Sequence, residues 1–119
     1  MLRKSMAVIL SLAASDVAAQ EASFLLTNGT AYPISQLAVS PADLGFWTAN
    51  FLRPPPIKAG ERRQVFYKAP TDYCQGDLRA EFADGGKPAI WEGLNLCALT
   101  KIKLQYDRMS GVTTASYDD

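Results

Sequence analysis

Histidine is absent from this sequence, and its absence excludes several common kinds of active site. A serine or cysteine nucleophile is usually activated by a neighbouring histidine, and many catalytic zinc ions are held by histidine. Nucleophile pairs of the Ser-His and Cys-His types and histidine-based metal sites are therefore ruled out. Because the remaining residues form no recognised catalytic motif, we expect no catalytic residue, no bound metal and no cofactor.

The chain also lacks an excess of either charge, since its 119 residues include 12 basic and 12 acidic side chains. A basic surplus would be needed to hold a nucleic-acid backbone, so we do not expect nucleic acid as a partner. Hydrophobic residues make up 48% of the sequence, which is normal for a globular domain with a buried core. The length argues for a single domain.

Carboxylates remain as candidates for acid–base chemistry, and Asp77, Glu81 and Glu92 are predicted to share one face of a hairpin. Two suitably spaced carboxylates hydrolyse glycosides in many enzymes. Here Arg79 lies among the three acids, which is typical of a surface charge ladder. A hydrolase that relies on carboxylates alone is therefore only a third hypothesis for the function.

No hydrophobic run in the sequence reaches the ~20 residues that a membrane-spanning helix needs. An apolar stretch, residues 5–15, follows Arg3 and Lys4 and precedes small residues that end at Ala19. This order is typical of a signal peptide, so residues 1–19 are predicted to be removed on export. We expect the mature chain to be periplasmic or secreted and to have no transmembrane segment.

Only two cysteines are present, Cys74 and Cys97, and in an oxidising compartment such a pair predicts a disulfide. Between them, an alternating apolar pattern, two glycines at residues 85–86 and a second apolar segment predict a β-hairpin. In a hairpin that turns at these glycines, the two cysteines lie equally far from the turn and face each other. The same register places Arg79 opposite Glu92 and predicts a cross-strand ion pair.

Two residues of this hairpin make the predicted register approximate. Pro88 cannot donate a ladder hydrogen bond, which favours a turn longer than two residues. Gly93 lies inside the returning strand, where an isolated glycine often marks a β-bulge.

Short apolar segments separated by turn residues make up the rest of the chain, without a helical period. This pattern predicts an all-β fold, a small antiparallel β-sandwich of the immunoglobulin-like or barrel-like kind, over residues 20–107. A turn or two of helix fits only around residues 41–50, and residues 108–119 are expected to form a weakly ordered tail. The predicted strands outside the hairpin are residues 24–27, 36–40, 63–67 and 101–106, with a weak last one at 111–115.

The sequence Asn28-Gly29-Thr30 matches the acceptor pattern for N-glycosylation. It also matches a turn that follows a strand, because Asn and Gly tolerate turn conformations. We favour the turn.

Aromatic and proline residues are concentrated in residues 44–56, and two interpretations predict opposite positions for them. In a binding loop, Trp47 would stack on a sugar or grip a peptide, with Phe46 and Phe51 as further candidate contacts. The proline run would then hold the following segment away from the sheet. In a connection that plugs the open end of the sandwich, the aromatics would be buried. The number of apolar side chains favours the plug, with Phe51 and Leu52 as anchors and Trp47 partly buried beside them.

Several of these residues together resemble the pattern of a group of small exported bacterial proteins of unknown function. The resemblance covers residues 24–104, and its most specific parts are Asp77-Leu78-Arg79 and Asn95-Leu96-Cys97. It implies export and a compact β domain, and it implies no activity. The other matching parts are Phe24-x-Leu26-x-Asn28-x-Thr30, Leu37-x-Val39-Ser40-Pro41, Trp47, Cys74 and Phe82-x-Asp84-Gly85.

The sequence departs from the group's pattern at three positions. The pattern has an aromatic residue where Ala38 stands, a glycine where Thr48 stands and an aromatic residue where Gly76 stands. These departures bear on a shared ligand more than on a shared fold.

The function most consistent with these features is that of an exported, non-catalytic binding or accessory module. Its partner is expected to be an envelope protein, a peptide or a glycan. The alternative is an envelope structural or assembly subunit, or a hydrolase inhibitor, that acts through a surface edge. An exposed Trp47 would favour the binding module, whereas self-association would favour the assembly subunit.

Overall fold

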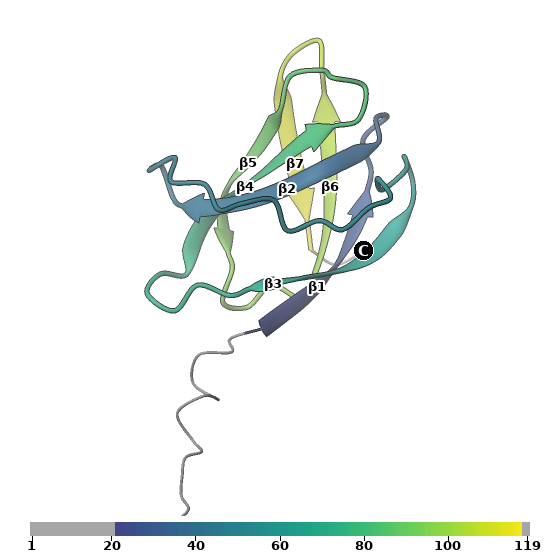
Figure 1. The fold of residues 1–119 in the computed structure, drawn as a ribbon. Helices are drawn as coiled ribbons and strands as arrows, with labels where there is room; N and C mark the ends of the chain where they lie inside the picture. The colour runs from purple at the N-terminus through teal and green to yellow at the C-terminus, as the bar shows by residue number, and fades with distance from the viewer. Residues whose placement is uncertain (1–20, 118–119) are drawn as a thin grey trace, which may run out of the picture.

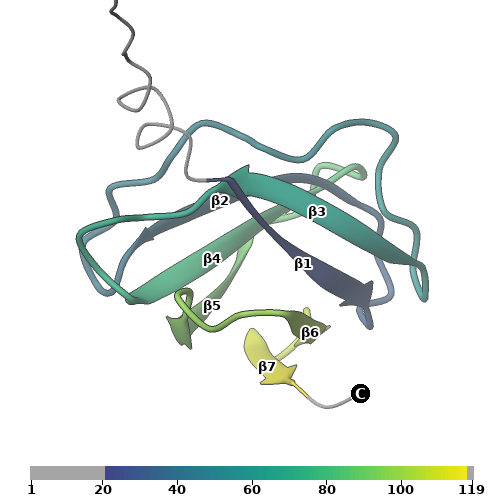
Figure 2. The same ribbon diagram turned by 90° about the horizontal axis from the view of Figure 1, so that it is seen from below.

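The computed structural model describes residues 21–117, which form seven β-strands and, within that range, no helix. The strands make two facing sheets, one ordered β3-β1-β6-β7 and the other β2-β4-β5 (Figures 1 and 2). The predicted signal peptide, residues 1–19, lies outside the described residues. The strands are β1 (Glu21–Asn28), β2 (Ile34–Pro41), β3 (Arg62–Lys68), β4 (Gln75–Phe82), β5 (Ala89–Asn95), β6 (Lys101–Asp107) and β7 (Val112–Ser116).

The predicted all-β sandwich is confirmed, and its two sheets do not close into a barrel. Neighbouring strands are antiparallel with one exception, because β1 pairs in parallel with β6 from Leu25 opposite Lys101 to Asn28 opposite Leu104. A parallel pair needs a long crossover, which the intervening strands of the sandwich provide. The prediction of a wholly antiparallel sandwich is therefore corrected at this strand pair.

The last strand corrects the predicted domain boundary. β7 pairs with β6 from Lys103 opposite Ser116 to Asp107 opposite Val112. Gly111, with φ at 77°, adopts the left-handed conformation that the connecting turn requires. The predicted domain boundary at residue 107 is therefore wrong. The predicted weakly ordered tail at 108–119 is wrong for the residues up to Ser116, where the sheet ends.

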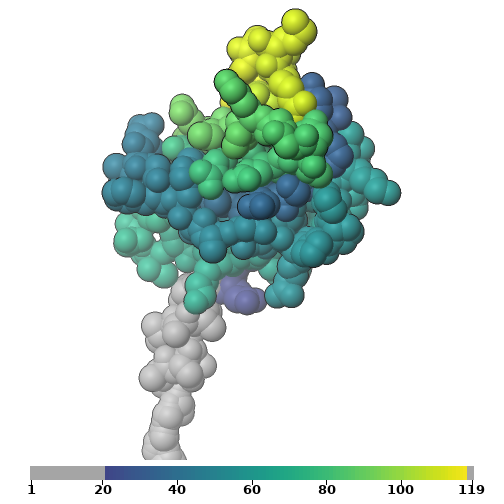
Figure 3. Space-filling view, turned by 45° about the horizontal axis from the view of Figure 1, so that its top comes forward, coloured from purple at the N-terminus to yellow at the C-terminus, as the bar shows by residue number. Residues whose placement is uncertain are grey.

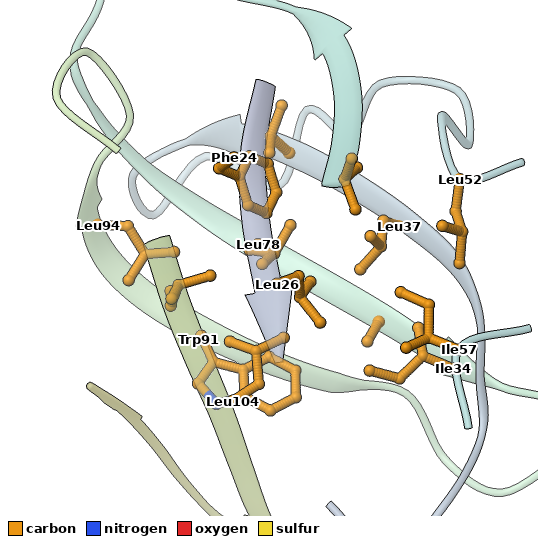
Figure 4. Packing of buried hydrophobic residues seen from close by; sticks show 14 of the residues in the cluster. Phe24, Leu26, Ile34, Leu37, Leu52, Ile57, Leu78, Trp91, Leu94 and Leu104 are labelled. Atoms are coloured by element: carbon orange, nitrogen blue, oxygen red, sulfur yellow. The ribbon is translucent and has the colours of Figure 1, made fainter. Parts of the chain in front are cut away.

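The core lies between the sheets and follows from the alternation of apolar side chains along each strand. Phe24 and Leu26 of β1 belong to one buried cluster with Leu78 of β4 and Leu104 of β6 (Figure 4). Burying a side chain of this size contributes about 1.5–3 kcal/mol to stability.

Trp91 is the largest fully buried side chain, and it joins the two sheets. Its backbone belongs to β5, whereas its indole N–H points to the other sheet. There it lies 3.2 Å from the carbonyl oxygen of Gln105 and 3.0 Å from that of Thr114. The indole is thus satisfied inside the core, as a buried tryptophan requires.

The β4–β5 hairpin contains the predicted disulfide and the predicted bulge. Cys74 and Cys97 are joined, with their Cα atoms 5.1 Å apart. The pairing shifts where Glu92 and Gly93 together oppose Asp77, and Gly93 has a φ of 70°. Both the disulfide and the bulge at the isolated glycine are therefore confirmed.

The predicted ion pair between Arg79 and Glu92 is wrong. Beyond the bulge, Arg79 lies opposite Ile90, because the bulge and a turn that spans residues 83–88 displace the partner strand by two residues. Arg79 instead has Glu81 of its own strand within 3.8 Å.

Candidate functional site

The candidate site is the loop that leaves the end of β2, residues 42–47, hereafter the apolar loop. It projects from one end of the sandwich, at the left in Figure 1. Leu44 is 55% exposed and Phe46 is 71% exposed. The expectation that these side chains would be buried in a plug is therefore wrong. The predicted turn or two of helix is also wrong, since residues 42–44 form a turn and the chain then continues without helix.

Two buried polar side chains hold the backbone of the apolar loop. The carboxylate of Asp77 accepts hydrogen bonds from the backbone N–H of Asp43 and from that of Gly93, each at 3.0 Å. The hydroxyl oxygen of Ser40 accepts the N–H of Phe46 at 2.9 Å. Because Asp77 and Ser40 lie in strands and are buried, they fix the loop against the sheet without help from a partner.

The conformation of the apolar loop needs this support. Asp43 has a φ of 66° and Gly45 a φ of 68°, so two residues of the short loop are left-handed. The left-handed region is uncommon for a residue with a Cβ atom, although aspartate tolerates it better than most. The N–H of Asp43 that Asp77 accepts therefore belongs to the residue whose backbone is under strain.

Close packing around Gly76 explains why this chain has glycine where the pattern of the resembling group has an aromatic residue. A Cβ atom added there would lie 2.5 Å from the Cδ1 atom of Leu96 and 2.9 Å from the carbonyl oxygen of Ser40. No larger side chain fits without moving the base of the apolar loop. The residue before Asp77 is thus restricted to glycine by close packing in this chain.

Trp47 lies on the outer face of the β2–β4–β5 sheet rather than in the core. The guanidinium carbon of Arg79 is 4.8 Å from the centre of its ring, within the range of a cation–π contact. Trp47 is half-buried, so the predicted partial burial is confirmed, but it is not part of the core cluster beside Leu52. The small hollow next to Arg79 has a volume of about 20 Å³, room for one water molecule at most.

The segment after the apolar loop covers the outer edge of β2. The N–H groups of Thr48 and Phe51 donate to the carbonyl oxygens of Val39 and Leu37, at 2.9 and 3.0 Å. In return, the N–H of Leu37 donates to the side-chain oxygen of Asn50 at 2.8 Å. An edge strand with free N–H and C=O groups invites pairing with another chain, and here this edge is occupied.

The predicted anchors of this segment are in place. Leu52 is buried in the core, and the ring of Phe51 lies 5.1 Å from that of Tyr67, whose pKa is raised by burial. The chain then returns to the sheet, since Ile57 is buried and exchanges backbone hydrogen bonds with Ile34. The proline run therefore does not hold the following segment away from the sheet.

The turn at Asn28-Gly29-Thr30 confirms the structural interpretation of that motif. Asn28 is fully buried, and its side-chain amide nitrogen donates to the carbonyl oxygens of Tyr32 and Ile57, at 2.8 and 2.9 Å. Its side-chain oxygen accepts from the backbone N–H of Thr30. With both amide hydrogens used inside the protein, this nitrogen is inaccessible for glycan attachment.

The opposite end of the sandwich contains a second arginine on an aromatic ring. The guanidinium carbon of Arg108 lies 3.5 Å from the ring centre of Tyr32, and its two terminal nitrogens reach Asp84 at 3.0 and 3.2 Å. These hydrogen bonds, with one from the N–H of Gly86, hold the pKa of Asp84 below its usual value. Both terminal nitrogens of Arg108 thus have a hydrogen-bond acceptor within the protein.

The three carboxylates of the predicted hairpin face have separate roles. Asp77 is buried and bound to backbone amides, Glu81 lies near Arg79, and Glu92 is exposed in the bulge. Among residues 21–117, no group of three or more cysteine, aspartate or glutamate residues is arranged to hold a metal ion. The same residues contain no helix that is long and apolar enough to cross a membrane.

Comparisons with known proteins identify no family for this chain. Neither a protein-family model nor a curated protein matches the chain. It is similar to the NMR structure of a protein from Eubacterium rectale, with 10% sequence identity and a TM-score of 0.49. That similarity covers 84% of this chain and 90% of the other, and it carries no information about function.

Sequence reasoning missed the residues that shape the apolar loop. Asp77 and Ser40 were assigned to strands, and only their burial reveals that they bind loop amides. A signal does exist in the sequence. Ser40 closes a continuous small and apolar run from Leu37, and a polar residue in such a run needs a hydrogen-bond partner.

Proposed function

We propose that this protein is an exported, non-catalytic binding module and that the apolar loop is its recognition element. One observation carries the proposal: Leu44 and Phe46 are exposed on a loop whose backbone is fixed by buried hydrogen bonds. Scattered exposed apolar residues are common on protein surfaces, but here two flank a left-handed glycine on a projecting, supported loop.

The chemistry of the apolar loop favours a protein partner with an apolar hollow. Aromatic side chains that enter such hollows supply much of the binding energy at protein interfaces. A loop that is already ordered loses less conformational entropy on binding than a flexible one. Trp47 is the last residue of the apolar loop, and the guanidinium of Arg79 lies on its ring. These two side chains would form the rim of the interface around Leu44 and Phe46.

The location in an envelope or outside the cell is part of the same proposal. The Cys74–Cys97 disulfide is compatible with an oxidising compartment. The resemblance to small exported bacterial proteins supports the same location, and we propose membership of that group on the residues that carry the resemblance.

The alternative, a subunit or inhibitor that acts through a strand edge, would have to use an edge other than that of β2. The outer edge of β2 is already hydrogen-bonded to residues 48–51. An inhibitor that inserts the apolar loop into the cleft of a hydrolase would be one form of the proposed module, in which the captured partner is an enzyme.

The test is a capture experiment that depends on the loop. The tagged mature protein, with its disulfide formed, is cross-linked in an extract of the envelope of the organism that makes it. We expect a discrete partner to be captured by the parent protein and lost with Phe46→Ser or Leu44→Ser. Both variants should keep the parent's free energy of unfolding within about 0.5 kcal/mol, as surface substitutions do.

Met109→Ser provides the matched control, because Met109 is 97% exposed at the far turn. It removes an exposed apolar side chain without touching the apolar loop, and capture should be unchanged. The proposal is contradicted if the set of captured proteins is the same for the parent and Phe46→Ser, or if Met109→Ser abolishes capture equally.

A further inference from the structure

The outer face of the β3-β1-β6-β7 sheet is basic, although the chain as a whole is neutral. Because Phe24, Leu26, Ile102 and Leu104 point inward, the residues between them point to solvent. The outward residues form one continuous, mostly polar surface across four strands. They are Arg62, Gln64, Phe66 and Lys68 of β3, Glu21, Ser23, Leu25 and Thr27 of β1, Lys101, Lys103, Gln105 and Asp107 of β6, and Val112, Thr114 and Ser116 of β7.

The registers of the strands place these residues in rows. Arg62 lies opposite Thr27, which lies beside Lys103, which in turn lies opposite Ser116. Neighbouring strands are ~4.8 Å apart, so Arg62 and Lys103 stand about 10 Å apart with a hydroxyl between them. Neither cation has an ion-pair partner among the described residues. Lys101 stands next to Lys103 on the same face of β6.

The acidic residues of the strands lie either at the edges of this basic face or on the other sheet. Within the described residues, the acids that share the basic face are Glu21, at the start of β1, and Asp107, at the end of β6. The outer face of the β2–β4–β5 sheet instead carries Glu81 and Glu92, with Arg79 as its cation. The two outer faces of the sandwich therefore differ in charge, and the neutral total conceals this.

We infer that the basic face binds an acidic polysaccharide laid across the strands. Arg62 and Lys103 would neutralise carboxylate or sulfate groups on the polymer. Hydroxyl and amide side chains between them, such as Thr27, Ser116 and Gln64, match the hydroxyl groups of sugars. Phe66, which is 60% exposed on the same face, offers an aromatic surface for the face of a sugar ring.

The shape of the face favours an extended polymer over a small anion. The depression lined by Leu25, Thr27, Lys103 and Ser116 is too shallow to hold a water molecule, so it is no enclosed site. Two features weigh against other polyanions. Phe66, Val112 and Leu25 together present too little apolar surface to enter a lipid bilayer, and a single exposed aromatic does not form the row of rings on which nucleic-acid bases stack.

The experiment measures binding of the full mature protein to sodium polygalacturonate and to dextran sulfate by isothermal titration calorimetry. Neutral dextran and vesicles that contain phosphatidylglycerol serve as comparisons. We expect binding to at least one acidic polysaccharide that weakens as salt is added, and no binding to dextran. Arg62→Gln combined with Lys103→Gln should weaken that binding by about tenfold, since two exposed charge contacts are lost.

The matched control combines Lys58→Gln with Lys87→Gln, which removes two exposed cations elsewhere and leaves net charge equal to that of the test variant. It should leave the affinity within about twofold. Phe66→Ser should also weaken binding without reducing the net charge. The inference is overturned by equal losses in the two double variants, by no effect of Phe66→Ser, by no binding to either acidic polymer, or by tighter binding to the vesicles. Each of these results is independent of the apolar loop, so Phe46→Ser should bind the polymer normally.

Discussion

The two ends of the β4–β5 hairpin are fastened by different means. Near the apolar loop, the hairpin is closed by the disulfide between Cys74 and Cys97. At the far end, the turn of the hairpin lies beside the β6–β7 turn, shown in green and yellow at the top of Figures 1 and 3. There Asp84 and Arg108 form a two-point ion pair. One end is fixed covalently and the other by non-covalent contacts alone.

Each end also has an arginine on an aromatic ring, and the two side chains are equally exposed, at 30%. Arg108 is bound at two points to Asp84 and lies 3.5 Å from Tyr32. Arg79 has only a 3.8 Å contact with Glu81 and lies 4.8 Å from Trp47. Exposure alone does not distinguish the two arginines, whereas their hydrogen bonds within the described residues do: Arg108 donates two to a carboxylate and Arg79 donates none. We interpret Arg108 as structural and Arg79 as available to a partner.

Removing the disulfide should have the largest effect on the stability of the fold. The double replacement Cys74→Ala with Cys97→Ala is expected to lower the free energy of unfolding by about 2–5 kcal/mol, as for other small disulfide-bonded domains. Chemical denaturation of the two proteins measures this difference. A loss below about 1 kcal/mol would show that the end of the β4–β5 hairpin near the apolar loop does not need the disulfide for its stability.

Removing the carboxylate under the apolar loop should have the next largest effect. Asp77→Ala leaves the N–H groups of Asp43 and Gly93 without their acceptor and is expected to cost about 1–3 kcal/mol. Glu81→Ala, four residues along the same strand, is the control and should change stability by no more than about 0.5 kcal/mol. Equal effects of the two substitutions would contradict the role assigned to Asp77.

The ion pair at the far end should be sensitive to acid. Because Arg108 and Gly86 lower the pKa of Asp84 in the folded state, this carboxylate stabilises the fold at pH values above its usual pKa of 3.8. That stabilisation is lost as the pH falls below 3.8 and the folded-state carboxylate becomes protonated.

Melting curves of the parent and Asp84→Asn at several pH values test this. The parent should be more stable near neutral pH by less than Asp77→Ala costs, because the pair is solvent-exposed, and the difference should vanish in strong acid. A difference that grows as the pH falls would contradict the assignment.

The contact between Trp47 and Arg79 should contribute least to stability. Trp47→Ala and Arg79→Ala are expected to show a coupling of about 0.5–1 kcal/mol in a double-mutant cycle, as for an exposed cation–π pair. Thermal denaturation of the four proteins measures the coupling. A loss of about 3–5 kcal/mol for Trp47→Ala alone would restore the core-plug interpretation of that residue.

Much of the fold was predictable from local pattern. The alternation in residues 101–106, the two glycines of the hairpin turn and the isolated Gly93 each act over a few residues, and each gave the correct element. The equal distance of the two cysteines from the turn gave the disulfide. These features are local, so the sequence reveals them directly.

The errors arose where the position of a residue depends on several features at once. The residue opposite Arg79 is set jointly by the β-bulge at Gly93 and by the length of the turn at residues 83–88. Leu44 and Phe46 are exposed because Ser40 and Asp77 hold the loop away from the core. An apolar sequence alone cannot distinguish a buried plug from a presented loop, because both contain the same side chains.

The central claim is that the apolar loop is ordered before any partner binds, and amide hydrogen exchange in the free protein tests it most directly. The amide protons of Asp43 and Phe46 should exchange at least about tenfold more slowly than those of Gly45 and Trp47, which have no acceptor among the described residues. Asp77→Ala should release the amide of Asp43, and Ser40→Ala that of Phe46. Exchange of all four amides at the rate of an unstructured peptide would contradict the account.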